Sequence, residues 1–519
     1  MQKLLDLAYR LDATGDMKEL ETFAAQRYNT VQVFMVLEKL LHGEQVRSAH
    51  LLALLLEKSG VRHVSVSFAL CVGELIYGRL TAERVQMLRA QTDPQGEKPV
   101  VIDKVLVRHA LVGLLNRLLP KGDQAAILWS VEILRAAMPE YHTIFDGSAP
   151  VETLSLERMR RRRPALQPLL DHPLPPTGAP RPQRRVLLLL GIQGTLIALR
   201  FMVAMKSYGW HAEICNRLSA SEQTAAEDCR LIAEQCRQNM IDILLLEAPR
   251  FCHMGQAHRH YTAMKRQLRE NHPDLRVLGI SFDSADTMEQ VLLEEMGELF
   301  DGLLQCHHNP QAPHMLNNPQ HKKKIIHDHL LPINDRHFGT TNRPLLPQLF
   351  FRGSIRHPHW ARLFWLAVAD RAGLPIAREI NQFLDANDSS RYDPSPQYSR
   401  WLLEDYATYI RKYTDATCCL SILTFGNMVR YLTGRSFEVL LSGALLVQEY
   451  SPLMHNHFIP GEHYLEFTTI AELTSIMRFI NERPEEAEEV RRRGHAFARA
   501  RYNDERIIGQ IDYLLYHQA

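Results

Sequence analysis

Apolar residues recur every three or four positions through the first 145 residues, and this spacing predicts a series of short amphipathic helices. Several of the periodic segments end at a glycine, as helix C-termini and tight turns between helices require. We therefore predict an all-helical domain over residues 1–150. Stacked hairpins of the tetratricopeptide kind and a plain helical bundle both fit this pattern. The clearest periodic segments are 31–41, 49–60, 104–119 and 126–138.

The hydrophobic pattern then gives way to arginines and prolines. The run from Arg158 to Arg163 is broken only by Met159, and seven prolines follow up to Pro182. Proline at this density is incompatible with a helix interior or a central strand and favours an extended chain. We expect a linker over residues 151–184, with the arginines on a solvated helix face rather than in a nucleic-acid or lipid patch.

Beyond the prolines, short apolar runs alternate with helical patterns. Alternation of this kind implies right-handed crossovers and doubly wound parallel sheets. The runs form two sets, which predict an α/β fold with two Rossmann-like domains, residues 185–345 and residues 346–519. Ligands of such sheets bind at the carboxyl ends of the strands, so we expect a cleft between the domains. The predicted strands lie within 185–191, 241–249, 275–283 and 300–306, and then within 347–354, 418–425 and 443–449.

The charge balance and the cysteines argue against a protein that binds nucleic acid or an acidic membrane surface and against a disulfide-bonded one. Lys and Arg total 60 against 59 Asp and Glu, so no overall field attracts nucleic acid or an acidic membrane surface. The eight cysteines form no Cys-x-x-Cys pair, which favours reduced thiols and a cytoplasmic protein. The most apolar stretch, 186–205, contains two glycines, a glutamine and an arginine, so we expect no transmembrane segment.

The segment from Gly434 to Tyr464 carries the residues best suited to bind a nucleoside diphosphate. A helix that starts near Gly434 would direct free backbone N–H groups and its positive dipole end at the diphosphate. Arg435 adds a planar set of donors for phosphate oxygens, and Glu438 can accept hydrogen bonds from both ribose hydroxyls. Gly443 permits a close backbone approach where the helix leads into the next strand. The alternative is a surface ion pair between Arg435 and Glu438.

These residues also follow one another in a recognisable order. An Arg-x-Phe-Glu helix start, a Ser-Gly-Ala turn, a strand and a Phe-x-Pro-Gly loop are followed by a Glu-Leu-x-x-Ile helix and a tail that contains Gly494, Tyr502 and Arg506. The segment resembles the C-terminal module of group 1 GT-B glycosyltransferases, particularly the spore-maturation type. The resemblance is good over 415–515, weaker over 185–415 and absent from the helical N-terminus.

The resemblance implies a GT-B fold and a nucleotide-sugar donor site in the C-terminal Rossmann-like domain. It places Arg435, Ser436, Glu438 and Gly443 in that site. The loop after the first strand of each sheet is a further candidate because glycine lets backbone approach a ligand. Gly353 and Ser354 would then meet the donor phosphates, although a simple turn explains them equally well. Gly191 and Gly194 would lie near the transferred sugar and the acceptor.

No catalytic base stands out among the titratable residues. The candidates at the carboxyl end of the first sheet are Glu247, His253, Asp283 and Asp286, and each of them also fits a role as a cap or turn residue. Four His-x-His pairs lack the further ligands that a zinc site needs at motif spacing. The two glycines of the first loop do not form Gly-x-Gly-x-x-Gly, so a nicotinamide is not expected. We therefore predict no metal and no cofactor.

Taken together, these features predict a metal-independent glycosyltransferase that moves a sugar from a nucleotide-sugar donor to a protein or glycan acceptor. Helical-repeat domains commonly present concave protein-binding faces, so residues 1–150 are expected to recruit the acceptor, which would make protein glycosylation the reaction. Two alternatives remain: a non-catalytic helical scaffold with a degenerate GT-B domain, and a GT-B nucleotide-sugar epimerase. The pattern leaves the donor base, the acceptor, the stereochemical outcome and the oligomeric state open.

Overall fold

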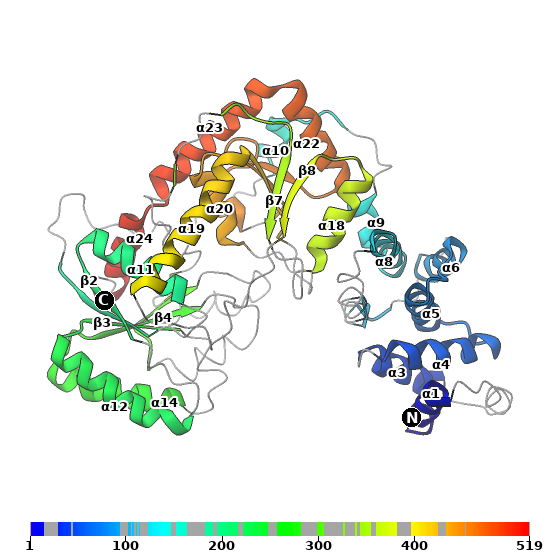
Figure 1. Ribbon diagram of the computed structural model, residues 1–519, viewed down its shortest axis with the longest axis horizontal. Helices are drawn as coiled ribbons and strands as arrows, with labels where there is room; N and C mark the ends of the chain where they lie inside the picture. Colours follow the sequence, from blue (N-terminus) through cyan, green and yellow to red (C-terminus); the bar gives the residue numbers. More distant parts are fainter. Residues whose placement is uncertain are drawn as a thin grey trace.

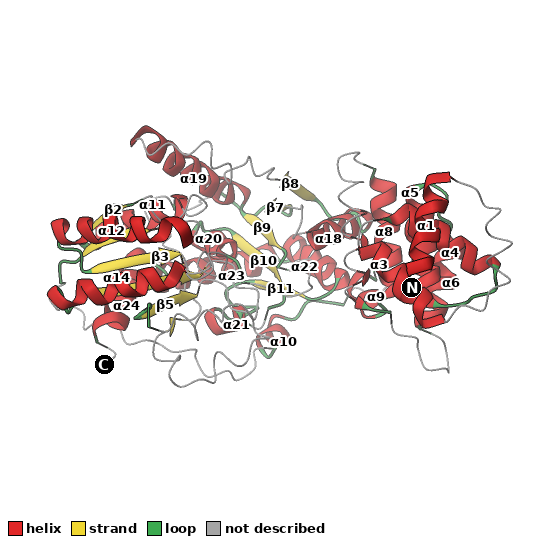
Figure 2. Ribbon diagram, turned by 90° about the horizontal axis from the view of Figure 1, so that it is seen from below, coloured by secondary structure: helices red, strands yellow, loops and turns green. Residues whose placement is uncertain are grey.

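Three parts follow one another along the molecule, and the second parallel sheet lies between the first sheet and the N-terminal helices (Figures 1 and 2). This computed structural model describes most of the chain but not all of it. The described residues are 2–14, 30–42, 45–93, 102–104, 106–107, 110–111, 114, 123–146, 152–162, 182–189, 195–215, 222–247, 257–281, 298–305, 325–326, 338–339, 343–353, 360–380, 396–423, 432–451 and 453–517.

The N-terminal part is helical, as the periodicity predicts. Side chains cap several of its helices: His63 accepts a hydrogen bond from the backbone N–H of Ser65, and Thr81 accepts one from that of Arg84. Successive helices pack on one another around a common apolar core. The helices are α1 (Gln2–Thr14), α3 (Thr30–His42), α4 (Val46–Lys58), α5 (Val64–Ile76), α6 (Ala82–Thr92), α8 (Gln124–Ala137) and α9 (Glu140–Phe145).

The first sheet is parallel and has six strands in the order β2-β1-β3-β4-β5-β6. Its central strands are buried along their length because helices cover both faces. The strands are β1 (Arg185–Leu189), β2 (His211–Ile214), β3 (Ile243–Glu247), β4 (Arg276–Ser281), β5 (Gly302–Gln305) and β6 (Ile325–Ile326), and the helices are α11 (Thr195–Tyr208), α12 (Glu222–Asn239) and α14 (Ala257–Asn271).

The second sheet is also parallel, with five strands in the order β11-β10-β9-β7-β8. The two sheets confirm the predicted pair of Rossmann-like domains. The strands are β7 (Leu349–Gly353), β8 (Ile376–Ile380), β9 (Cys418–Ser421), β10 (Leu445–Glu449) and β11 (Leu465–Phe467). The helices are α18 (Trp360–Arg371), α19 (Pro396–Ala416), α20 (Gly434–Leu441), α21 (Met454–His457), α22 (Ile470–Glu482) and α23 (Pro484–Arg501).

The helical part shares a continuous core with one face of the second sheet. The ring of Trp365 on α18 bridges the two, since it lies 5.1 Å from the ring of Phe145 on α9 and 5.2 Å from that of Phe467 on β11. Arg371 on α18 also donates to Glu132 on α8 at 2.8 Å. An aromatic contact of this kind adds to the area buried, so the helical part is fixed to the second sheet.

The segment expected as a linker is docked where the structure describes it. Leu156–Arg160 forms a short helix, α10, whose Arg160 donates to the carbonyl of Gly461 at 3.2 Å. Arg162 pairs with Glu472 on α22. The basic run therefore contacts the second sheet's domain through two of its arginines, while the proline-rich residues 163–181 lie outside the described part of the chain.

The last helix, α24 (Asp504–Tyr516), crosses back to the first sheet. Arg184 pairs with the buried Asp512 at 3.1 Å, and Tyr516 donates to the carbonyl of Asp242 at 3.2 Å. The expected domain 346–519 includes this helix by sequence, whereas α24 packs on α11 of the first domain. The chain thus joins the two Rossmann-like domains twice.

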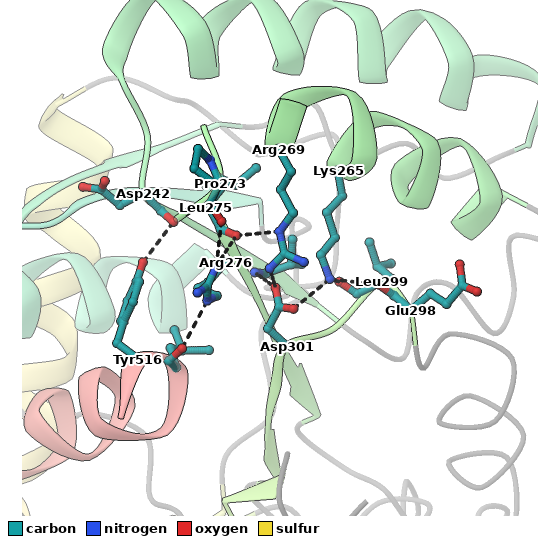
Figure 3. A network of polar contacts seen from close by, with 12 residues as sticks. Asp242, Lys265, Arg269, Pro273, Leu275, Arg276, Glu298, Leu299, Asp301 and Tyr516 are labelled. Carbon is teal, nitrogen blue, oxygen red and sulfur yellow. Dashed lines mark hydrogen bonds and ion pairs between the residues drawn. The ribbon is translucent and has the colours of Figure 1, made fainter. Parts of the chain in front are cut away.

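A polar network holds the amino-terminal edge of the first sheet (Figure 3). The buried ammonium of Lys265 donates to the carbonyls of Glu298 and Leu299 and to Asp301, all within 2.9 Å. Asp301 also pairs with Arg269 at 3.0 Å. All three donors of the Lys265 ammonium are used, so this network has a structural role. It lies at the amino-terminal ends of the strands, opposite the carboxyl ends at which ligands bind.

Candidate functional site

Helix α20 carries the residues that the sequence singles out, and its ends explain its position. Its N-cap residue, Thr433, is extended, and the Thr433 side chain makes no capping hydrogen bond. At the other end Gly443 has a φ of 75°, a conformation that favours glycine, and the chain enters β10 two residues later. The N-terminus of α20 is therefore left without a side-chain cap at the carboxyl ends of the strands.

The Arg435 side chain lies at the end of β7. A methyl group built on Gly353 would come within 2.5 Å of Nη2 of Arg435, so the absence of a side chain at this position makes room for the guanidinium. Its Cζ lies 5.7 Å from the centre of the Phe351 ring. The Nε and Nη1 atoms of Arg435 are buried and have no hydrogen-bond partner among the described residues. A buried donor without an acceptor is costly, which marks these atoms as candidates for ligand contact.

Three tyrosines of α19 face α20. The hydroxyl groups of Tyr409 and Tyr413 lie 2.5 Å apart, and burial raises the pKa of both phenols. Burial likewise holds the pKa of Tyr406 well above its usual value. All three phenols therefore stay protonated at neutral pH and can act as hydrogen-bond donors.

The Glu438 carboxylate contacts the other Rossmann-like domain. Its Oε1 accepts a hydrogen bond from the hydroxyl of Tyr406 at 3.0 Å and lies 3.6 Å from Nη2 of Arg200 on α11. The guanidinium of Arg200 stacks over the Tyr406 ring, 4.5 Å from its centre. All three side chains are buried. Arg435 and Glu438 do not pair with each other, so the surface ion pair considered as the alternative does not form.

A second buried guanidinium lies near Arg435. Arg362 on α18 donates to the carbonyl of Ile422 at 3.1 Å, and burial together with the nearby charge of Arg435 lowers the pKa of Arg362 to about 9. Two cations this close to the ends of β7 and β9 create a region of positive potential. The sequence offers no signal for Arg362, since it falls within an apolar helix pattern.

Further polar side chains around the N-terminus of α20 are buried without partners in the described part of the chain. Thr433 and Ser436 belong to the first turn and its cap, Ser421 ends β9, Gln448 lies next to it on β10, and Ser451 follows β10. Buried polar atoms are paired in most proteins. Their concentration here indicates a surface whose hydrogen bonding a polar ligand would complete.

The Phe-x-Pro-Gly loop has a packing role. The ring of Phe437 on α20 lies 5.5 Å from that of Phe458 in the loop and 5.1 Å from that of Tyr502 in the tail. Gly461 has a φ of 73°, and a methyl group there would lie 2.6 Å from the carbonyl oxygen of Leu156 on α10. The aromatic residues of the motif therefore form one core with α20, and its glycine allows the loop to pack closely on α10.

The structure leaves most of the remaining candidates undecided. Glu247 ends β3 at the carboxyl edge of the first sheet and is buried. The other predicted residues of this sheet, and Ser354 after β7, lie outside the described residues; these are Gly191, Gly194, His253, Asp283, Asp286 and Ser354. The described residues therefore identify no catalytic base.

His455 and His457 form one of the four His-x-His pairs of the sequence. His455 pairs with Glu466 at 2.7 Å, and His457 contacts the hydroxyl of Tyr502 at 2.8 Å, so the members of this His-x-His pair face different partners. Within the described ranges no group of three or more potential ligands could hold a metal ion. The six cysteines described are buried and form no disulfide with one another. No helix of this part of the chain is long and apolar enough to cross a bilayer.

A family model described as "Glycosyl transferase-like" matches residues 389–512, the span from α19 to most of α24. This match and the two parallel sheets confirm the predicted resemblance to GT-B glycosyltransferases at the level of the family. The spore-maturation type stays a prediction. A search of curated proteins finds no match to the sequence.

Solved structures are similar to about two thirds of the chain. HepE of Anabaena in complex with UDP and glucose covers 64% of this chain and 99% of its own, with a TM-score of 0.44 and 11% identity. Sucrose-phosphate synthase of Thermosynechococcus elongatus covers 65% and 100%, with a TM-score of 0.42 and 14% identity. UDP-GlcNAc 2-epimerase of Neisseria meningitidis bound to UDP-GlcNAc covers 64% and 99%, with a TM-score of 0.37 and 10% identity.

Proposed function

We propose that this chain is a glycosyltransferase that takes a sugar from a nucleotide-sugar donor and binds the donor at the N-terminus of α20. The observation that carries the proposal is the guanidinium of Arg435, whose buried Nε and Nη1 have no acceptor among the described residues. A diphosphate supplies the acceptor oxygens that these donors lack. The uncapped start of α20 adds its partial positive charge at the same place.

In the proposed reaction, hydrogen-bond donors of the protein stabilise the leaving diphosphate in place of a metal ion. When the bond between the sugar and the diphosphate breaks, negative charge develops on the diphosphate oxygens. Arg435, the nearby Arg362 and the backbone N–H groups of α20 would stabilise that charge in the buried site, where electrostatic interactions are strong. Glu438, one turn further along α20, would accept hydrogen bonds from the ribose of the same nucleotide.

We also propose that the helical part recruits the acceptor, a protein or a glycan, and that the reaction takes place in the cytoplasm. Helical-repeat surfaces commonly bind proteins. The shared core with the second sheet supports this role, because an acceptor bound to the helices would be held at a fixed distance from the donor site.

Calorimetric titration of the full chain with a panel of UDP, GDP, ADP and CDP tests the donor site. One hydrogen bond to a charged group contributes about 1.5–3 kcal/mol, so Arg435→Ala should weaken the binding of the preferred nucleotide by roughly 10- to 100-fold. Arg492→Ala is a matched control, because Arg492 is exposed and pairs with Glu489 on the same helix, α23. Unchanged affinity in Arg435→Ala would contradict the proposal.

A nucleotide-sugar that carries the preferred nucleotide then shows whether the chain transfers the sugar or epimerises it. Incubation of the donor with the chain and a co-purified acceptor should release the nucleoside diphosphate and add a hexose-type mass to the acceptor. An epimerised donor without transfer would identify an epimerase. Binding of no nucleotide at all would leave the chain as a helical scaffold with a degenerate GT-B part.

A further inference from the structure

The two oxygens of the Glu438 carboxylate lie in different environments. Oε1 has two donors, the hydroxyl of Tyr406 at 3.0 Å and the guanidinium of Arg200 at 3.6 Å. Oε2 makes no hydrogen bond to any described residue. A carboxylate in this state has one oxygen fixed by the protein and one available to a ligand hydroxyl.

Arg200 comes from a different domain than Glu438. It lies on α11, the helix that follows the first strand of the first sheet, whereas Glu438 and Tyr406 belong to the second sheet's domain. Helix α11 packs against α19 and against α24, so the contact lies where the two Rossmann-like domains meet. The Arg200 side chain is 7% exposed, so its charge is little screened by solvent.

Two donors fix the orientation of the Glu438 carboxylate. The hydroxyl of Tyr406 and the guanidinium of Arg200 approach the same oxygen, Oε1. Arg200 is the cation that pairs with Glu438 in the described part of the chain. With Oε1 held in this way, the direction in which Oε2 can accept a hydrogen bond depends on the pairing with Arg200.

We propose that Arg200 is a positioning residue for the donor: it holds the Glu438 carboxylate in an orientation in which Oε2 accepts a hydrogen bond from the ribose 2′-hydroxyl. This inference rests on the proposed function of α20. Because Arg200 belongs to the opposite domain, the ribose contact is complete only when the two Rossmann-like domains are together. Donor recognition is thereby tied to the arrangement of the domains.

The test compares the affinity for UDP with that for 2′-deoxy-UDP. Any other nucleoside diphosphate that the chain binds is compared with its own 2′-deoxy form in the same way. The wild-type chain should prefer the ribonucleotide by about tenfold, the effect of one hydrogen bond to a charged group. Arg200→Gln should reduce this preference to less than twofold, and Arg200→Lys, which keeps the charge, should retain part of it. Arg230→Gln is the matched control, because Arg230 of the same domain pairs with Glu227 on an exposed helix face.

A second readout separates positioning from a general loss of structure. Arg200→Gln should weaken the binding of the ribonucleotide by about tenfold and leave the binding of the 2′-deoxynucleotide unchanged, because only the ribose contact depends on Arg200. Thermal unfolding of both Arg200 variants checks that they are folded.

Two results would overturn the inference alone. In the first, Arg200→Gln keeps the full preference for ribose while Glu438→Gln loses it. In the second, Arg200→Gln binds UDP more tightly than the wild type, which would identify Arg200 as a competitor of the ribose. A wild-type chain that binds no nucleotide, or unchanged affinity in Arg435→Ala, would instead overturn the proposed function, and the inference with it.

Discussion

Replacement of Gly353 by alanine should weaken nucleotide binding without removing any charge. The added methyl group would lie 2.5 Å from Nη2 of Arg435, 3.1 Å from its Cζ and 3.2 Å from its Nη1. Ordinary contacts between such atoms are about 3.5–4.0 Å, so the guanidinium must move by about 1 Å. The backbone at Gly353 belongs to the end of β7 and has no unusual φ, so alanine fits the strand itself.

The size of the effect follows from that displacement. A misplacement of about 1 Å in a positioning group can reduce activity by about 100-fold, and a displaced Arg435 loses the alignment that a diphosphate requires. We therefore expect nucleotide affinity to fall by about 10- to 100-fold in Gly353→Ala, with a smaller change in thermal stability. Isothermal titration calorimetry measures the first quantity, and thermal unfolding measures the second.

A matched glycine elsewhere supplies the control. Gly339→Ala adds the same methyl group where no heavy atom of the described residues, apart from its chain neighbours, lies within 4 Å, so its affinity should equal that of the wild type. If Gly353→Ala is folded and binds the nucleotide as tightly as Gly339→Ala does, the guanidinium of Arg435 is not the group that contacts the diphosphate.

Two further predictions concern stability. A methyl group on Gly494 would lie 2.0 Å from the backbone carbonyl oxygen of His463, so Gly494→Ala should lower the free energy of unfolding by about 3 kcal/mol in a denaturant titration, whereas Gly339→Ala should not. Burial, together with Arg84, lowers the pKa of His50 to about 4. Between pH 6.5 and 4 the unfolded chain binds a proton that the folded chain does not, so stability present above pH 6.5 should decline by up to about 3 kcal/mol toward pH 4. Thermal unfolding at several pH values measures this dependence of stability on pH, which should be absent in His50→Leu. If stability still declines by the same amount between pH 6.5 and 4 in His50→Leu, His50 is not the cause.

The strands that could be predicted from the sequence are those in the middle of each sheet. Central strands such as β3 and β10 are buried on both faces and read as continuous apolar runs. The four strands missed, β2, β6, β8 and β11, are the edge strands of the two sheets. Edge strands are short or mix charged and apolar residues, as Ile376–Ile380 does with its arginine and glutamate, so their pattern is weak.

The candidate site was predictable only where its residues are close in sequence. Arg435 and Glu438 lie on one helix and within a motif, whereas Arg200 and Arg362 reach them through tertiary packing from helices whose pattern is apolar. The tyrosines of α19 offered a signal that the sequence reading did not use. Tyr406, Tyr409 and Tyr413 recur at the spacing of one helix face, which predicts a shared surface.

The docking of the helical part bears on how donor and acceptor could meet. Its core is continuous with the second sheet, and α10 adds contacts to the same domain, so the helices and the donor site form one unit. The first Rossmann-like domain joins this unit through α24 and through the contact between Arg200 and Glu438. If an acceptor binds the helices, this unit holds the donor and the acceptor together, and the first domain adds Arg200 to the contact with the ribose. A variant that breaks the Arg200 contact should therefore impair donor binding while leaving the binding of an acceptor to the helices unchanged.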